Sequence, residues 1–206
     1  DNNKKNIIGK NFVGVIQTFS SHYPYNSLPN VTAPYKPCDL TRSTGVDSFK
    51  NCYLNGQIAS AATKEQLLKS VDLEKTIVIM TSDHGEGMNE HGIWFHGVDY
   101  HQEMVKVPLF IYIPDNIKQK IPTDLLANLQ KNTEKVVSVM DVLPTVLDLH
   151  QVLSRQDLKP KDTTFSGRSL LRPWDYRVVF SSHCFPQYRC YSREIAFIDD
   201  DYFVLY

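Results

Sequence analysis

The chain has no long hydrophobic run, no excess of charge of either sign and no internal repeat. Its longest apolar stretch, Val107 to Ile113, is far shorter than the ~20 residues that a membrane-spanning helix needs. With 22 basic and 23 acidic residues, it lacks the basic excess that nucleic-acid binding requires. Hydrophobic residues make up 42% and charged residues 22%, and these ordinary values exclude a disordered tail or a coiled coil.

The length of 206 residues fits one globular domain, or one domain with a small appendage. The chain opens with polar residues rather than with Met or a signal peptide. We therefore expect it to be a fragment or a processed product.

The four cysteines form two local pairs, Cys38 with Cys52 and Cys184 with Cys190. An even number of cysteines without a Cys-x-x-Cys motif favours two disulfides and an oxidising compartment. Two alternatives stay open. The cysteines are reduced in a cytosolic protein, or all four bind zinc, although their spacing fits zinc modules poorly.

The hydrophobic pattern predicts alternating strands and helices. The expected strands are residues 10–19, 76–80, 107–113, 136–139, 177–181, 195–198 and 202–206. The expected helices are residues 52–70, a short segment at 100–105, and one that Asp141 caps, with Pro144 in its first turn. The proline-rich stretch 20–50 is expected to be a long loop, and loops of this length are usually functional.

The continuous apolar run 76–80 is typical of a central parallel strand that is covered on both faces. Together with the alternation of elements, it predicts an α/β fold with a mostly parallel sheet flanked by helices. We expect the core to span about residues 10–150. The remaining residues, about 151–206, should form a small β-rich portion.

The segment Thr81 to Gly97, TSDHGEGMNEHGIWFHG, follows this apolar strand directly. Ligands of open α/β sheets gather beyond the carboxyl ends of strands, where Asp83 and His84 would emerge. An adjacent carboxylate and imidazole suit Zn²⁺ or Mn²⁺ better than Ca²⁺. His91 and His96 follow in the same segment. The alternative is a polar surface loop that happens to be rich in histidine.

Several motifs of the chain together resemble one family. They are the DHGE block at 83–86, EHG at 90–92, HG at 96–97, VPL at 107–109, DVLPTVLD at 141–148, FSGRSL at 165–170, SSHYPY at 20–25 and YKPC at 35–38. The chain resembles the sulfatase branch of the alkaline phosphatase superfamily, which also contains phosphoethanolamine transferases and lipoteichoic acid synthases. The resemblance covers about residues 12–170 and implies the C-terminal half of an alkaline-phosphatase-like catalytic domain.

The resemblance implies that Asp83 and His84 bind a divalent metal, with zinc or manganese favoured and calcium as the ion of many sulfatases. It implies that His22 and His96 line the substrate side as catalytic residues, where they would donate hydrogen bonds or protonate a leaving alkoxide. His22 is otherwise a loop histidine without a role. Glu86 is expected to orient His84 or to help close the turn, and His91 to lie behind the ligands or to be exposed.

The resemblance implies that the nucleophile and the first metal-binding acid belong to an N-terminal half, which we expect to be missing from these residues. Cys38 and Cys184 each lie in a near match to the sulfatase nucleophile motif. We reject both, because the Cys38 segment lacks the proline, the Cys184 segment has its arginine one place late, and both lie in the wrong part of the chain. We expect an enzyme acting on an anionic phosphate or sulfate ester, carried by a lipid or a glycan. The alternative is a non-catalytic relative that binds a lipid or glycan.

This chain by itself is expected to be inactive. The disulfides and the family predict a periplasmic, extracellular or lumenal location. A segment before residue 1 would be the place for a membrane anchor, and we expect no nucleic-acid partner.

Overall fold

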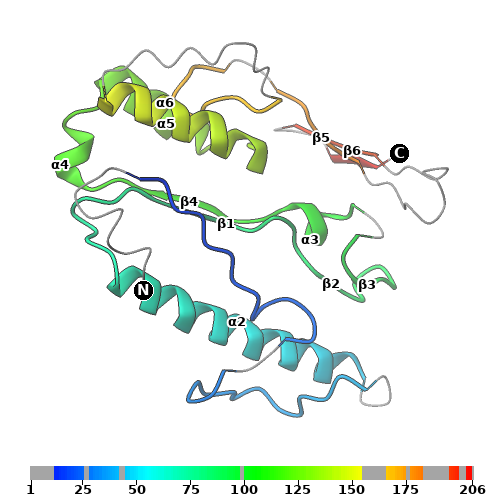
Figure 1. Cartoon of the computed structure of the whole chain (residues 1–206). Helices are drawn as coiled ribbons and strands as arrows, with labels where there is room; N and C mark the ends of the chain where they lie inside the picture. Colours follow the sequence, from blue (N-terminus) through cyan, green and yellow to red (C-terminus); the bar gives the residue numbers. More distant parts are fainter. Residues whose placement is uncertain are drawn as a thin grey trace. The chain divides into compact units, whose positions relative to one another are not determined.

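The computed structural model describes most of the chain, with several short gaps. The described residues are 12–25, 28–41, 45–97, 100–154, 166–174, 177–182, 195–199 and 203–205. The chain divides into two compact units, one ending at Lys69 and one beginning at Ser70. Figure 1 shows the elements of each unit along the sequence.

The first unit is built on the long helix α2 (Val46–Lys69). This confirms the predicted helix, which begins earlier than the hydrophobic pattern indicated. The preceding loop is fastened to α2 by the disulfide Cys38–Cys52, with Cα atoms 4.8 Å apart. The buried Asn55 side chain bonds both backbone groups of Tyr35, at 3.1 and 2.9 Å. The first predicted disulfide is therefore confirmed, whereas the cysteines of the second lie outside the described residues.

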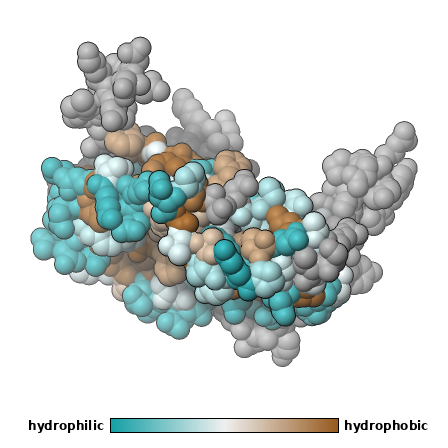
Figure 2. All heavy atoms as spheres, turned by 90° about the horizontal axis from the view of Figure 1, so that it is seen from below, coloured by the Kyte–Doolittle hydropathy of each residue, from teal (hydrophilic) through white to brown (hydrophobic). Residues whose placement is uncertain are grey.

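The strand predicted over residues 10–19 is wrong for its described part, residues 12–19, which has no regular structure. Val15 is 93% exposed and Ile16 66% exposed. A buried strand needs partners on its hydrogen-bonding edges, and none of the described strands pairs with this segment. On the face drawn in Figure 2, hydrophobic side chains reach the surface between hydrophilic ones.

In the second unit, β1 (Val78–Thr81) pairs with β4 (Leu109–Tyr112). The two strands are antiparallel, with Val78 opposite Tyr112 and Thr81 opposite Leu109. Both strands were predicted, but the parallel neighbours expected for β1 are absent from the described pairings, which are all antiparallel. Residues 76–80 are partly exposed rather than buried on both faces, and a parallel sheet stays a prediction.

Helices pack beside this strand pair and form the core of the second unit. They are α4 (Asp115–Lys118), α5 (Thr123–Asn132) and α6 (Val142–Ser154), of which α5 and α6 lie side by side in Figure 1. The core residues are Ile113, Ile121, Leu125, Leu149 and Leu171. Burying each such side chain contributes about 1.5–3 kcal/mol. The sequence pattern missed α4 and α5.

Asp141 does not cap α6 as predicted. Ser138 is the N-cap of the short 3-10 helix η2 (Val139–Asp141), which continues into α6, and Asp141 completes a capping box with it. The strand predicted over 136–139 is wrong because this turn begins there. Pro144 lies in the first turn of α6, as expected.

Three short strands, β5 (Val179–Ser182), β6 (Ile195–Ile198) and β7 (Phe203–Leu205), form an antiparallel sheet. They confirm the β-rich C-terminal portion. The remaining elements are β2 (Gly87–Met88), β3 (Trp94–Phe95) and α3 (Gln102–Val105). Helix α3 confirms the short helix predicted at 100–105. None of the helices in the described ranges is long and apolar enough to cross a membrane.

Candidate metal centre

The loop after β1 is held against α3 by its backbone. Gly85 N–H donates to the carbonyl of Met104 at 2.7 Å, and Glu86 N–H donates to the carbonyl of Glu103 at 3.1 Å. A Cβ on Gly85 would lie 1.9 Å from the Glu103 carbonyl oxygen, so only glycine allows this approach. The two hydrogen bonds fix the direction in which Asp83 and His84 leave the strand.

The Asp83 and His84 side chains face one another across a gap of metal-ligand size. His84 Nδ1 lies 2.7 Å from the Gly85 carbonyl oxygen. Because a carbonyl only accepts, Nδ1 carries the proton and Nε2 bears the lone pair. Nε2 lies 3.7 Å from Asp83 Oδ2. Two ligands of one tetrahedral zinc ion are about 3.3 Å apart, so this pair needs only a small adjustment to share an ion.

The other oxygen of Asp83 is used within the loop. Asp83 Oδ1 accepts from the backbone N–H of His84 at 3.2 Å, and the Ser82 hydroxyl donates to the His84 carbonyl at 2.8 Å. The Asp83 side chain is 73% exposed, and that of His84 is 37% exposed. The loop thus orients Oδ2 toward His84 while leaving the pair accessible to an ion from solvent.

Glu86 holds His96, a contact that the sequence hypotheses did not include. Its carboxylate oxygen Oε1 lies 2.9 Å from His96 Nδ1, and the Glu86 side chain is only 6% exposed. The His96 ring stacks on the His84 ring with centroids 3.9 Å apart. The structure therefore brings Asp83, His84, Glu86 and His96 into one cluster.

His22 lies in the first unit, in a turn packed on α2. A Cβ on Gly56 of α2 would lie 2.7 Å from the Ser20 carbonyl oxygen, so this glycine lets the turn approach the helix. Tyr25 in the same turn is buried and contacts the Tyr53 ring edge-on at 5.6 Å. His22 Nδ1 lies 2.7 Å from the Tyr23 carbonyl oxygen. In both His22 and His84, a neighbouring backbone carbonyl accepts from Nδ1 and orients the ring.

A groove of about 1450 Å³ in the second unit reaches the Asp83–His84 pair and His96. Its walls are mostly apolar, and they carry both basic residues (Lys106, Lys118 and Lys135) and acidic ones (Asp83, Glu134 and Asp199). The groove is large enough for a substrate bigger than a simple ester.

His91 lies apart from this cluster, against two residues that the sequence reasoning did not single out. Its Nδ1 is 2.7 Å from Glu103 Oε1, and its ring stacks on that of His101. The only signal in the sequence is the spacing of His101 and Glu103, two residues apart next to a histidine-rich loop.

The family model that describes sulfatases matches residues 2–152. The chain belongs to the sulfatase family. This confirms the resemblance to the sulfatase branch of the alkaline phosphatase superfamily, and membership implies the alkaline-phosphatase-like α/β fold. The matched range contains both His22 and the whole Asp83–His96 cluster.

Curated relatives include sulfatases and a transferase. Arylsulfatase K of Gallus gallus is 35% identical over 116 residues, covering 56% of this chain and 17% of that protein. An ulvan-active sulfatase of Formosa agariphila is 28% identical over 165 residues, covering 73% of this chain and 30% of that protein. Phosphoethanolamine transferase EptA of Escherichia coli is 25% identical over 122 residues, covering 53% and 22%. The chain therefore spans less than a third of the length of these sulfatase-family proteins.

Proposed function

We propose that this chain carries part of the metal-binding site of an enzyme that cleaves or transfers a phosphate or sulfate ester group. The observation that carries the proposal is the orientation of His84. Its Nδ1 is fixed by the Gly85 carbonyl, and its Nε2 faces Asp83 Oδ2 at 3.7 Å. Asp83 and His84 would hold a divalent ion, and their donor set favours zinc or manganese over calcium. When bound, such an ion stabilises negative charge on the transferred group.

His96 would act on the oxygen of the leaving group. The buried Glu86 carboxylate accepts from Nδ1, which keeps the imidazole in one tautomer and one orientation. When its ring is charged, His96 would donate a hydrogen bond or a proton to that oxygen from this fixed orientation. His22, in the loop on α2, is also proposed to be a catalytic residue, as the family resemblance implies.

The substrate would be an anionic ester on a lipid or a glycan. The size of the groove supports a carrier molecule larger than a simple ester. The Cys38–Cys52 disulfide supports an oxidising location, which is periplasmic, extracellular or lumenal. The relatives are much longer than this chain, so we propose that the nucleophile is supplied from outside these residues.

Metal content tests the proposal directly. We expect Asp83→Asn to lose one equivalent of zinc or manganese after dialysis against a fixed free-metal concentration, as measured by elemental analysis. His150→Asn is the matched control, because His150 is an exposed histidine on α6, away from the loop. Equal metal content in Asp83→Asn and the parent protein would defeat the proposed ligand pair.

Activity measurements test the proposed source of the nucleophile. We expect no metal-dependent hydrolysis of p-nitrophenyl phosphate, p-nitrophenyl sulfate or a phosphodiester by this chain alone. Turnover that Asp83→Ala abolishes would place a nucleophile within these residues.

A further inference from the structure

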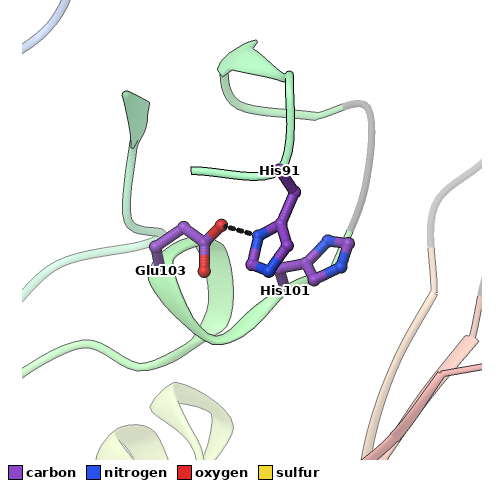
Figure 3. Close-up of side chains that lie close together, drawn as sticks. All are labelled: His91, His101 and Glu103. Atoms are coloured by element: carbon purple, nitrogen blue, oxygen red, sulfur yellow. Dashed lines mark hydrogen bonds and ion pairs between the residues drawn. The ribbon is translucent and has the colours of Figure 1, made fainter. Parts of the chain in front are cut away.

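A second group of metal-ligating side chains shares no residue with the Asp83–His84 pair. It consists of His91, His101 and Glu103, whose ligand atoms all lie within 4.8 Å of one another. Figure 3 shows the three side chains converging, with Glu103 and His101 coming from the α3 region and His91 from the β2–β3 turn. We propose that these residues bind a zinc-class divalent ion that cross-links the two elements.

The distances within the group are close to those of a ligand set. Glu103 Oε1 and His91 Nδ1 are 2.7 Å apart, and the His91 and His101 rings stack with centroids at 3.7 Å and an interplanar angle of 16°. Ligands of one tetrahedral zinc ion are about 3.3 Å apart. The three ligand atoms, all within 4.8 Å of one another, would therefore need only a small rearrangement to share an ion.

The backbone beneath each ligand is already held. The His101 carbonyl accepts from Met104 N–H at 2.8 Å, and the Glu103 carbonyl accepts from Glu86 N–H. His91 lies in a tight turn in which Asn89 N–H donates to the Ile93 carbonyl at 2.9 Å. Ligands on two preformed elements lose little conformational freedom when they bind an ion, so a site of three ligands can be effective.

The chemistry of the group selects the ion. Two imidazoles and one carboxylate form a recognised zinc ligand set, which leaves a fourth position for water. Calcium and magnesium prefer sets made only of oxygen ligands. The His91 side chain is 47% exposed and that of Glu103 24% exposed, so an ion from solvent reaches them directly.

Zinc binding by the His91–His101–Glu103 group is measured best in a variant that lacks the Asp83–His84 pair. In the double variant Asp83→Asn/His84→Asn, we expect one zinc ion per chain by equilibrium dialysis and elemental analysis. Adding His101→Gln should weaken this binding at least tenfold, whereas adding His150→Gln should not change it. His101→Gln is preferred because it leaves the His91–Glu103 contact in place.

Two results would overturn the second site: no zinc bound by the double variant, or binding that His101→Gln leaves unchanged. Nuclear magnetic resonance of the imidazole nitrogens in the same double variant provides a check without further substitution. Zinc should shift the ring signals of His91 and His101, and unshifted signals would overturn the site. Metal loss in Asp83→Asn tests the Asp83–His84 pair, whereas the double variant tests the second group. The two proposals can therefore be refuted independently.

Discussion

Asp141→Asn should be among the most damaging single substitutions in the second unit. The Asp141 carboxylate is fully buried and accepts from the backbone N–H groups of Ser138 and Arg168, each at 2.7 Å. It also accepts from the Arg177 guanidinium, whose side chain is only 11% exposed. One carboxylate thus fixes the start of α6, the 166–174 segment and the approach to β5.

The size of the stability loss follows from the hydrogen bonds that an amide cannot accept. Asn retains one acceptor oxygen, but its NH₂ group would face an N–H donor, which leaves at least one buried donor unpaired. The Arg177 charge would also lose its carboxylate. Removing one partner of a buried ion pair costs about 3–5 kcal/mol, so we expect a loss of about 4 kcal/mol in the free energy of unfolding. Typical domains have about 5–15 kcal/mol in total.

Urea unfolding followed by far-UV circular dichroism measures this loss. Asp115→Asn is the control, since the Asp115 side chain is 89% exposed and its replacement should change stability by less than about 0.5 kcal/mol. Adding Arg177→Met to Asp141→Asn should recover part of the loss, because no unpaired guanidinium then remains buried. A loss below about 1 kcal/mol for Asp141→Asn would refute the reasoning.

Two further predictions concern stability. Arg172 donates two hydrogen bonds to the Asp148 carboxylate, at 2.8 and 2.9 Å, and these hold the pKa of Asp148 below its ordinary value. Because the folded pKa is the lower one, the pair stabilises above about pH 4 and this stabilisation disappears as the pH falls through the lowered pKa. Asp148→Asn should therefore lower the free energy of unfolding by about 1 kcal/mol at pH 7, a value that is discounted because Arg172 is half-exposed. Near pH 2 the substitution should have no effect. An equal loss at both pH values would contradict this prediction. Replacing both Cys38 and Cys52 by Ala opens a loop with a sequence separation of 14 and should cost about 3 kcal/mol in urea unfolding, whereas unchanged stability would argue against a disulfide in solution.

The sequence predicted those features that depend on neighbouring residues. The histidine-rich segment after β1, the helix that became α2 and the short helix α3 each follow from local spacing and glycine placement. The direction of β1 relative to its neighbour did not follow. An apolar run indicates only that a strand is covered, and the antiparallel pairing with β4 depends on how the chain returns between them.

Residues distant in the sequence decided the roles of the acidic side chains. Asp141 was predicted as a helix cap because Asp is a good N-cap, yet its carboxylate accepts from Arg168 and Arg177, which lie 27 and 36 residues further along. Glu86 lies two residues from His84 in the sequence, but its carboxylate contacts His96, ten residues away. A sequence pattern carries no information on which distant donor reaches a given acceptor.

By itself, the sequence determined the chemistry of the site: which residues can ligate a metal, and that glycines let the loop after β1 turn. It determined this because ligand identity and backbone freedom are properties of single residues. Only the tertiary structure decided that His84 Nε2 faces Asp83, that Glu86 holds His96, and that His91 meets His101 and Glu103. Those pairings are set by the hydrogen bonds of Gly85 and Glu86 to α3, and they arise only when the loop folds back onto that helix.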